Sequence, residues 1–178
     1  MFRIVVTMLW VWMAGVAPAF ADASLFVQRL SGKISDAAET SVSQTALILG
    51  RYFDINAMAF AALPEAYRPK ATQAYVTAYH ASVAGRFYKE FQSAGEGGLR
   101  VLGVRENGNL TLVGTEVHEG GRRLMVEFYL RRDGTSFKVV NVALEGLLIT
   151  KQQQRDFQPI LISGDIPGLI NWLERTGS

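Results

Sequence analysis

The chain lacks the residues on which several classes of protein depend. It has no cysteine among its 178 residues, which excludes disulfide bonds, thiol catalysis and a lipid-modified cysteine. Its two histidines, His80 and His118, have no second ligand at metal-binding spacing, and no HExxH pair or calcium-type acidic loop occurs. A G-x-S-x-G nucleophile turn is also missing. From the sequence we therefore expect a protein that binds no metal or other cofactor and is not an enzyme.

A strong charge of either sign is also absent. The chain has 18 Lys and Arg residues against 16 Asp and Glu residues, a formal net charge of +2. Binding to nucleic acid is therefore not expected. The pairs Arg122-Arg123 and Arg131-Arg132 flank predicted turns, where solvated charge is the ordinary finding, and contact with a membrane or a partner stays an alternative for them.

The first residues predict export. Arg3 precedes an apolar run from Ile4 to Val16, and Ala19-Phe20-Ala21 has the small-x-small pattern of a signal-peptidase site. A membrane anchor is the alternative, but the run is short of the ~20 apolar residues that span a bilayer. We expect residues 1–21 to be a cleaved signal peptide, residues 22–178 to form a single α+β domain, and the mature protein to reside in the periplasm.

The first half of the mature chain reads as helical. Helices are predicted over 24–30 and 37–52, with a break at Ser31-Gly32, and a short helix over 55–63 with Asp54 as its N-cap. A long helix is expected over about 70–93, closed by the glycines that follow. Apolar side chains recur along it at four-residue steps and form a broad ridge: Tyr75, Tyr79, Val83, Phe87 and Phe91.

Between residues 99 and 144 the period changes to two. Turn signals at 107–108, 119–121 and 132–135 separate four predicted strands. The third strand alternates most clearly, with one face buried and one wet; the face predicted to be buried comprises Leu124, Val126, Phe128 and Leu130.

After Glu145-Gly146 the chain is predicted to form a helix over 151–162, a break at Ser163-Gly164, and a last helix capped by Asp165. We expect an α+β fold. The helical N-terminal half and the C-terminal helices should pack on one face of a curved, mainly antiparallel sheet of about four strands, as in a nuclear-transport-factor-like cone.

The order of these landmarks resembles the MlaC (toluene-tolerance) family over roughly residues 42–173. Three stretches carry the resemblance. The first is ILGRYFDINAMAFAALPEAYRPKATQAYVTAY, with its Phe53-Asp54 pair. The second runs from Phe137 through Glu145-Gly146 to Phe157. The third is GDIPGLINWL. The chain departs from the family pattern at Phe137 (usually Trp), Asn141 (usually Asp) and Leu147-Leu148 (usually Val-Ser).

The resemblance implies a periplasmic phospholipid carrier, expected as a monomer, without catalytic residues. It would move lipid between an outer-membrane lipoprotein complex and an inner-membrane ABC transporter complex, with the acyl chains in an apolar cavity between helices and sheet. The lipid-binding residues we expect are Tyr79, Val83, Phe87, Val126, Phe128, Leu130, Leu147, Ile149 and Phe157.

Three other interpretations stay open. A carrier of another lipid, such as a hopanoid, needs a wider and shorter cavity. A non-catalytic envelope adaptor predicts a filled core and an exposed apolar patch. A small nuclear-transport-factor-like enzyme requires Asp54 or His80 to point into a polar pocket as a base.

Overall fold

Helices cover one face of an open antiparallel sheet, which confirms the predicted fold class. The computed structural model describes residues 17–94, 98–119 and 122–177. In chain order, the elements are α1 (Ala17–Thr40), α2 (Val42–Tyr52), α3 (Ile55–Ala62), the 3-10 helix η1 (Glu65–Lys70), α4 (Gln73–Ala94), β1 (Leu99–Asn107), β2 (Leu110–Glu119), β3 (Arg122–Asp133), β4 (Ser136–Leu144), β5 (Leu147–Leu148) and α5 (Ile149–Thr176).

The sheet has five strands in the order β1-β2-β3-β4-β5, each antiparallel to its neighbour. Two of the predicted turns are confirmed, because Gly108 and Gly134 have φ of 63° and 58°, which glycine adopts without strain. The third predicted turn, at residues 119–121, falls largely outside the described residues. The prediction missed β5, whose two residues are too few to show any periodicity.

The two faces of the sheet differ as the β3 alternation predicts. Phe128 and Leu130 are buried on the helix side, whereas Met125, on the other side of β3, is exposed. Arg131, which the alternation places on the wet face, instead pairs with Asp54 at the start of α3 on the helix side. The opposite face carries the cross-strand ion pairs Arg100–Glu116 (3.2 Å) and Arg105–Glu127 (2.8 Å). The apolar core therefore lies between the sheet and the helices.

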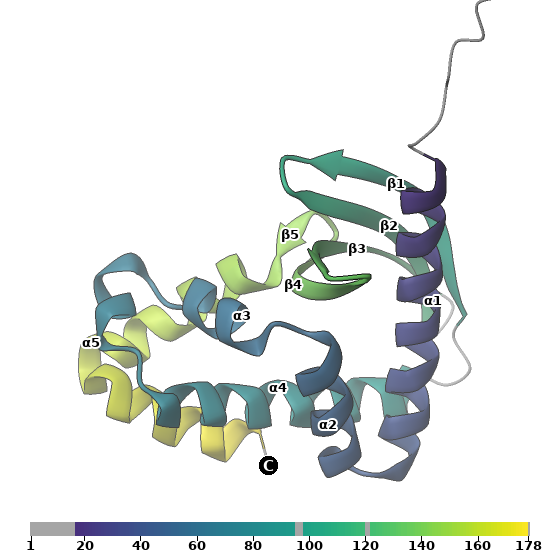
Figure 1. The fold of residues 1–178 in the computed structure, drawn as a ribbon. Coiled ribbons are helices and arrows are strands. Elements are labelled where there is room, and N and C mark those ends of the chain that lie inside the picture. Colours follow the sequence, from purple (N-terminus) through teal and green to yellow (C-terminus); the bar gives the residue numbers. More distant parts are fainter. Residues whose placement is uncertain (1–16, 95–97, 120–121, 178) are drawn as a thin grey trace, which may run out of the picture.

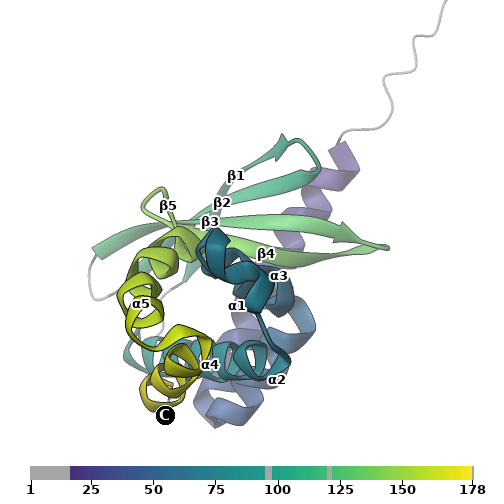
Figure 2. The same ribbon diagram turned by 90° about the vertical axis from the view of Figure 1, so that its left-hand side faces the viewer.

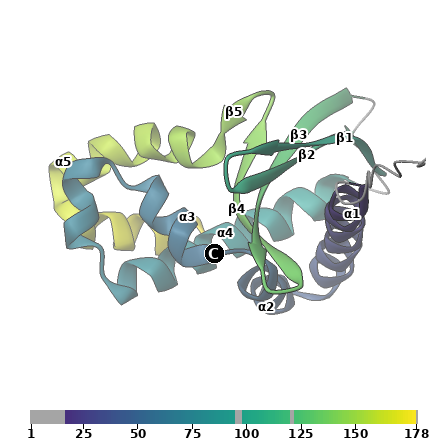
Figure 3. The ribbon, with the colours of Figure 1, turned by 45° about the horizontal axis from the view of Figure 1, so that its top comes forward.

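Helix α1 packs on the sheet, whereas α4 packs on the other α-helices. Helix α1 contacts β1, β2 and β4, while α4 contacts α1, α2, α3 and α5. Seen from one end, α3, α4 and α5 form an arc on one side of the sheet (Figure 2). Figure 1 shows α1 beside the sheet and α4 with α5 beneath it, and Figure 3 shows the β3–β4 hairpin reaching over to α2.

The predicted break at Ser31-Gly32 is wrong, because α1 runs through both residues. A helical glycine costs only about 1 kcal/mol, and burial of Val27, Leu30 and Ile34 on one side of α1 outweighs that cost. The helix ends instead at Thr40. The hydroxyl of the next residue, Ser41, caps α2 by accepting a hydrogen bond from the Gln44 amide at 3.2 Å.

Two further boundaries follow from side-chain caps. Asp54 caps α3 as predicted, with Oδ1 accepting the Ala57 amide hydrogen bond at 2.9 Å. Helix α4 begins at Gln73 rather than at residue 70, because η1 occupies residues 65–70 and the Thr72 hydroxyl accepts the Tyr75 amide at 3.2 Å.

The C-terminal break is confirmed but displaced by one residue. Helix α5 is interrupted at Asp165, which has φ 50° and ψ −157°, a strained conformation for a residue other than glycine. Its carboxylate accepts a hydrogen bond from Lys70 Nζ at 2.8 Å, which lowers the pKa of Asp165 and raises that of Lys70.

Among the described residues, none of the helices is both long and apolar enough to cross a bilayer. The predicted signal run from residue 4 to 16 lies outside those residues, and α1 starts just after it. Cleavage before Asp22 stays a prediction.

The close approach of α5 to α4 gives a stability prediction. A Cβ at Gly85 would lie 2.0 Å from the Gly177 carbonyl oxygen. We expect Gly85→Ala to displace the end of α5 and lower the free energy of unfolding by about 1–3 kcal/mol, measured by urea denaturation. The control Gly32→Ala meets nothing within 4 Å and should raise that free energy by about 0.5–1 kcal/mol. Equal effects of the two substitutions would contradict the packing described here.

Candidate functional site

The predicted lipid contacts gather, with one exception, in the apolar interior between sheet and helices. Tyr79, Val83, Phe128, Leu130 and Phe157 belong to the buried core, and Phe87, Val126 and Ile149 are partly buried and packed against it. Leu147 lies outside this body, at 44% exposure in β5. We refer to this body as the apolar interior.

The ridge of α4 supplies one wall of the apolar interior. Tyr75, Tyr79 and Val83 are buried, and the ring of Phe87 packs edge-on against that of Phe53 with centroids 5.9 Å apart. The four-residue spacing predicted that these side chains share a face, and the structure turns that face inward. The side chain of Phe91 falls outside the part of the chain that is described.

Phe53 also packs in the apolar interior, although it is not among the predicted lipid-binding residues. It is 2% exposed and sits at the junction of α2 and α3, where it forms a parallel bridge with Val139 of β4. The Asp54 amide then donates to the Val139 carbonyl at 2.8 Å. The Phe53-Asp54 pair of the family motif could have pointed to this contact. In the structure, the pair joins the helices to the edge of β4.

Buried polar groups of the apolar interior are paired across helices. The Tyr79 hydroxyl donates to Gln153 Oε1 of α5 at 3.0 Å, and the Tyr75 hydroxyl donates to the Ala59 carbonyl of α3 at 2.8 Å. Burial raises the pKa of both tyrosines well above the ordinary value. Both hydroxyls therefore stay protonated and act as fixed hydrogen-bond donors.

The glutamine run at the start of α5 is structural. Gln153 accepts the hydrogen bond of Tyr79, and Gln154 donates through Nε2 to the Ala61 carbonyl of α3 at 2.6 Å. Asn141, at a position where the family pattern has Asp, donates to the Thr150 hydroxyl at 2.8 Å. These bonds hold the first turns of α5 against α3 and β4, beside the predicted contact Ile149.

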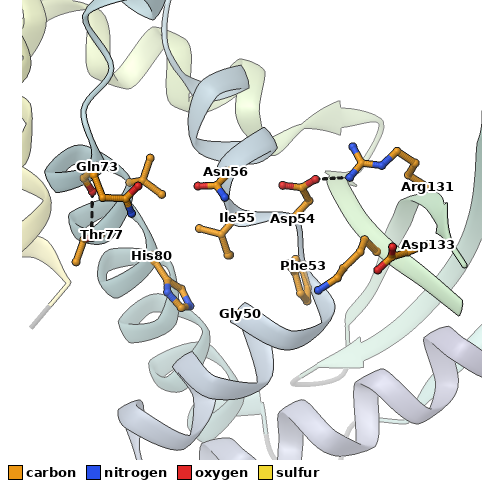
Figure 4. Close-up of a pocket in the computed structure, with 12 residues that line it drawn as sticks. Gly50, Phe53, Asp54, Ile55, Asn56, Gln73, Thr77, His80, Arg131 and Asp133 are labelled. Carbon is orange, nitrogen blue, oxygen red and sulfur yellow. Dashed lines mark hydrogen bonds and ion pairs between the residues drawn. The ribbon is translucent and has the colours of Figure 1, made fainter.

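A polar pocket of about 450 Å³ opens between α2, α3, α4 and the β3–β4 hairpin. In Figure 4, Gln73, Thr77 and His80 from α4 lie on one side, Arg131 and Asp133 from the hairpin lie on the other, and Asp54 and Asn56 lie between them. Its remaining lining residues are Gly50, Phe53, Ile55, Val76 and Lys138.

Asp54 and His80, the residues required by the enzyme interpretation, both line this polar pocket. Each already has a partner within the chain. Asp54 caps α3 through Oδ1 and forms an ion pair with Arg131 through Oδ2, and Nε2 of His80 lies 2.9 Å from the Ala46 carbonyl oxygen. Among the described residues, no three His, Cys, Asp or Glu side chains are grouped to hold a metal ion.

An exposed apolar rim surrounds the predicted contact Leu147. Leu144 is paired with Leu147 across the β4–β5 turn and with Val126 of β3. The side chains of Leu144 and Leu147 are 46% and 44% exposed. Glu145 holds the turn, because its amide donates to the Met125 carbonyl at 2.9 Å and its carboxylate accepts the Met125 amide at 2.7 Å.

Comparisons with known proteins agree on the family and the fold. The family model described as "MlaC protein" matches residues 26–175. No curated protein matches the chain. A solved phospholipid-binding protein from Ralstonia solanacearum, in complex with a phospholipid, has a TM-score of 0.72 at 13% identity, covering 88% of this chain and 97% of its own. At that identity the likeness establishes the fold alone.

The hydrogen bond between Tyr79 and Gln153 can be tested by mutation. Tyr79→Phe leaves Gln153 Oε1, in a side chain 6% exposed, without its donor. We expect the free energy of unfolding to fall by about 1–3 kcal/mol in urea denaturation. Tyr88→Phe, which removes a hydroxyl from a partly exposed position of the same helix, should change it by less than about 0.5 kcal/mol. A Tyr79→Phe effect as small as the control would show that the bond contributes nothing.

Proposed function

The chain belongs to the MlaC family, and from this premise we propose that it is a phospholipid carrier of the periplasm. It holds the acyl chains in the apolar interior and leaves the head group near solvent. It takes lipid from one membrane complex and delivers it to another, between the outer and inner membranes. Transfer needs no bond to be made or broken, so the protein acts without catalysis.

One observation carries this proposal. The family match extends from α1 into the last turns of α5, so it includes both walls of the apolar interior. The Ralstonia protein that shares the fold was solved with a phospholipid, which supports the same class of ligand here. The predicted contacts from α4, β3 and α5 face one another across that interior.

The magnitude of the hydrophobic effect explains why an enclosed site is needed. Burying one methylene is worth about 0.8 kcal/mol, so exposing two long acyl chains to water costs on the order of 20 kcal/mol. That cost exceeds the stability of a typical domain, about 5–15 kcal/mol. Because the chains are buried both in the membrane and in the carrier, the net free energy of transfer can be small and delivery reversible.

Lipid entry requires the packed interior to open. Leu147 and Ile149 lie where β5 passes into α5, with Leu147 exposed and Ile149 partly buried. We propose that this rim contributes to the acyl-chain contacts together with Tyr79, Val83, Phe87, Val126, Phe128, Leu130 and Phe157. The bonds of Gln153 and Gln154 to α4 and α3 then keep the helices together while the interior is filled.

Native mass spectrometry of the chain purified from the periplasm tests the proposal. We expect about one phospholipid per chain. Val126→Trp adds bulk at a partly buried position of the interior and should lower lipid occupancy severalfold, because the two occupy the same space. Leu47→Trp, at a position 65% exposed, serves as the control and should leave occupancy unchanged.

Two outcomes would contradict a phospholipid carrier. Repeated recovery of lipid-free wild-type protein would favour the adaptor interpretation. Recovery of a hopanoid or another non-phospholipid in stoichiometric amount would keep a lipid carrier but exclude a phospholipid as its cargo.

A further inference from the structure

The polar pocket lies directly against the apolar interior. Phe53 lines the pocket and is also buried in the core, where its ring contacts Phe87. Val76 likewise lines the pocket and packs on the core. A molecule with its apolar part beside Phe87 can therefore place a polar end among the pocket residues. The volume of about 450 Å³ is within the range of small-ligand pockets.

Two permanent cations reach this pocket from the β3–β4 hairpin. Arg131 forms its ion pair with Asp54 through one terminal nitrogen, and a guanidinium has five N–H donors. Lys138 donates to the Arg51 carbonyl, a neutral acceptor, and forms no ion pair with any described residue. Both side chains therefore keep the capacity to bind an anion.

Neutral donors and the start of a helix add to this capacity. Asn56 lies in the first turn of α3, and Gln73 and Thr77 face it from α4 (Figure 4). The amide groups in the first turn of a helix favour a negative charge. Asp54 uses the Ala57 amide, and Asp133 is the second carboxylate of the pocket. The cations Arg131 and Lys138 and the carboxylates Asp54 and Asp133 give the pocket charges of both signs, as suits a head group that carries both.

We infer that the polar pocket binds the phosphodiester of the lipid head group, an inference that rests on the proposed carrier function. Arg131 and Lys138 bind the phosphate, with the side-chain amides of Asn56 and Gln73 as additional donors. Asp133 accepts from the ammonium group of a zwitterionic head group. Free phosphate shares the anionic chemistry, so the test separates the two sources.

The experiment offers the lipid-free protein vesicles that contain equal amounts of phosphatidylethanolamine and a diacylglycerol with the same acyl chains. The lipids retained by the repurified protein are quantified by mass spectrometry. We expect the wild type to retain the phospholipid about tenfold over the diacylglycerol, since charge-assisted hydrogen bonds to phosphate are lost in the latter. The double variant Arg131→Gln with Lys138→Gln should retain the two almost equally.

Matched variants separate recognition from folding. Arg105→Gln removes an arginine that is paired with Glu127 on the far face of the sheet, and it should keep the wild-type preference. Arg131→Lys, which conserves the charge, should keep most of it. Thermal unfolding identifies any variant that fails to fold, and Lys138→Gln alone, which leaves the Arg131–Asp54 pair intact, should still reduce the preference severalfold.

The outcomes are distinct. A wild type that retains both lipids equally overturns the head-group assignment and leaves the carrier function standing, whereas a wild type that retains neither contradicts the carrier function itself. A titration of lipid-free protein with inorganic phosphate tests whether the pocket binds free phosphate instead of a lipid head group. Phosphate binding that Arg131→Gln abolishes, without any preference between the lipids, would make the pocket a site for free phosphate and overturn the proposal.

Discussion

Burial of the apolar ridge of α4 is the constraint on which the rest of the structure depends. Tyr75, Tyr79 and Val83 are buried along one side of that helix, and α4 contacts α1, α2, α3 and α5. Each large apolar side chain contributes about 1.5–3 kcal/mol when fully buried. The two tyrosines also place hydroxyls inside, and these bond to α3 and α5. The arrangement of the helices around α4 follows from satisfying both the apolar area and these donors.

Local patterns predicted the elements well and their ends less well. The two-residue alternation of β3 and the four-residue spacing in α4 identified the faces that are buried. The break at Ser31-Gly32 failed because tertiary burial of Val27, Leu30 and Ile34 outweighs a local glycine signal. The cap at Asp54 succeeded because the hydrogen bond that defines it spans only three residues.

For the candidate site, the sequence predicted the apolar face of α4 and β3, but of the residues that line the polar pocket it named only Asp54 and His80 as pocket candidates. Periodicity and the family resemblance both indicate the residues of the apolar interior. The polar pocket, by contrast, is formed by residues from segments that lie far apart in the sequence. Arg131 reaches Asp54 across 77 residues of sequence, and Lys138 reaches the Arg51 carbonyl across 87. No sequence-spacing rule connects such distant positions. From the sequence, Arg131-Arg132 could therefore be interpreted only as solvated charge beside a turn, and the pairing with Asp54 could not be predicted. The polar pocket and the apolar interior adjoin at Phe53, which lines the first and is buried in the second.

The central claim is that the acyl chains occupy the apolar interior, and paramagnetic relaxation in methyl NMR tests it most directly. The protein is loaded with a phospholipid that carries a nitroxide partway along one acyl chain. The account predicts strong broadening of the methyl signals of Val83 and Leu130, which are buried, and none for Leu47 and Ile162, which are 65% and 72% exposed. Broadening confined to Leu47, Ile162 or other exposed methyls, with the interior signals unchanged, would place the lipid on the surface and contradict the account.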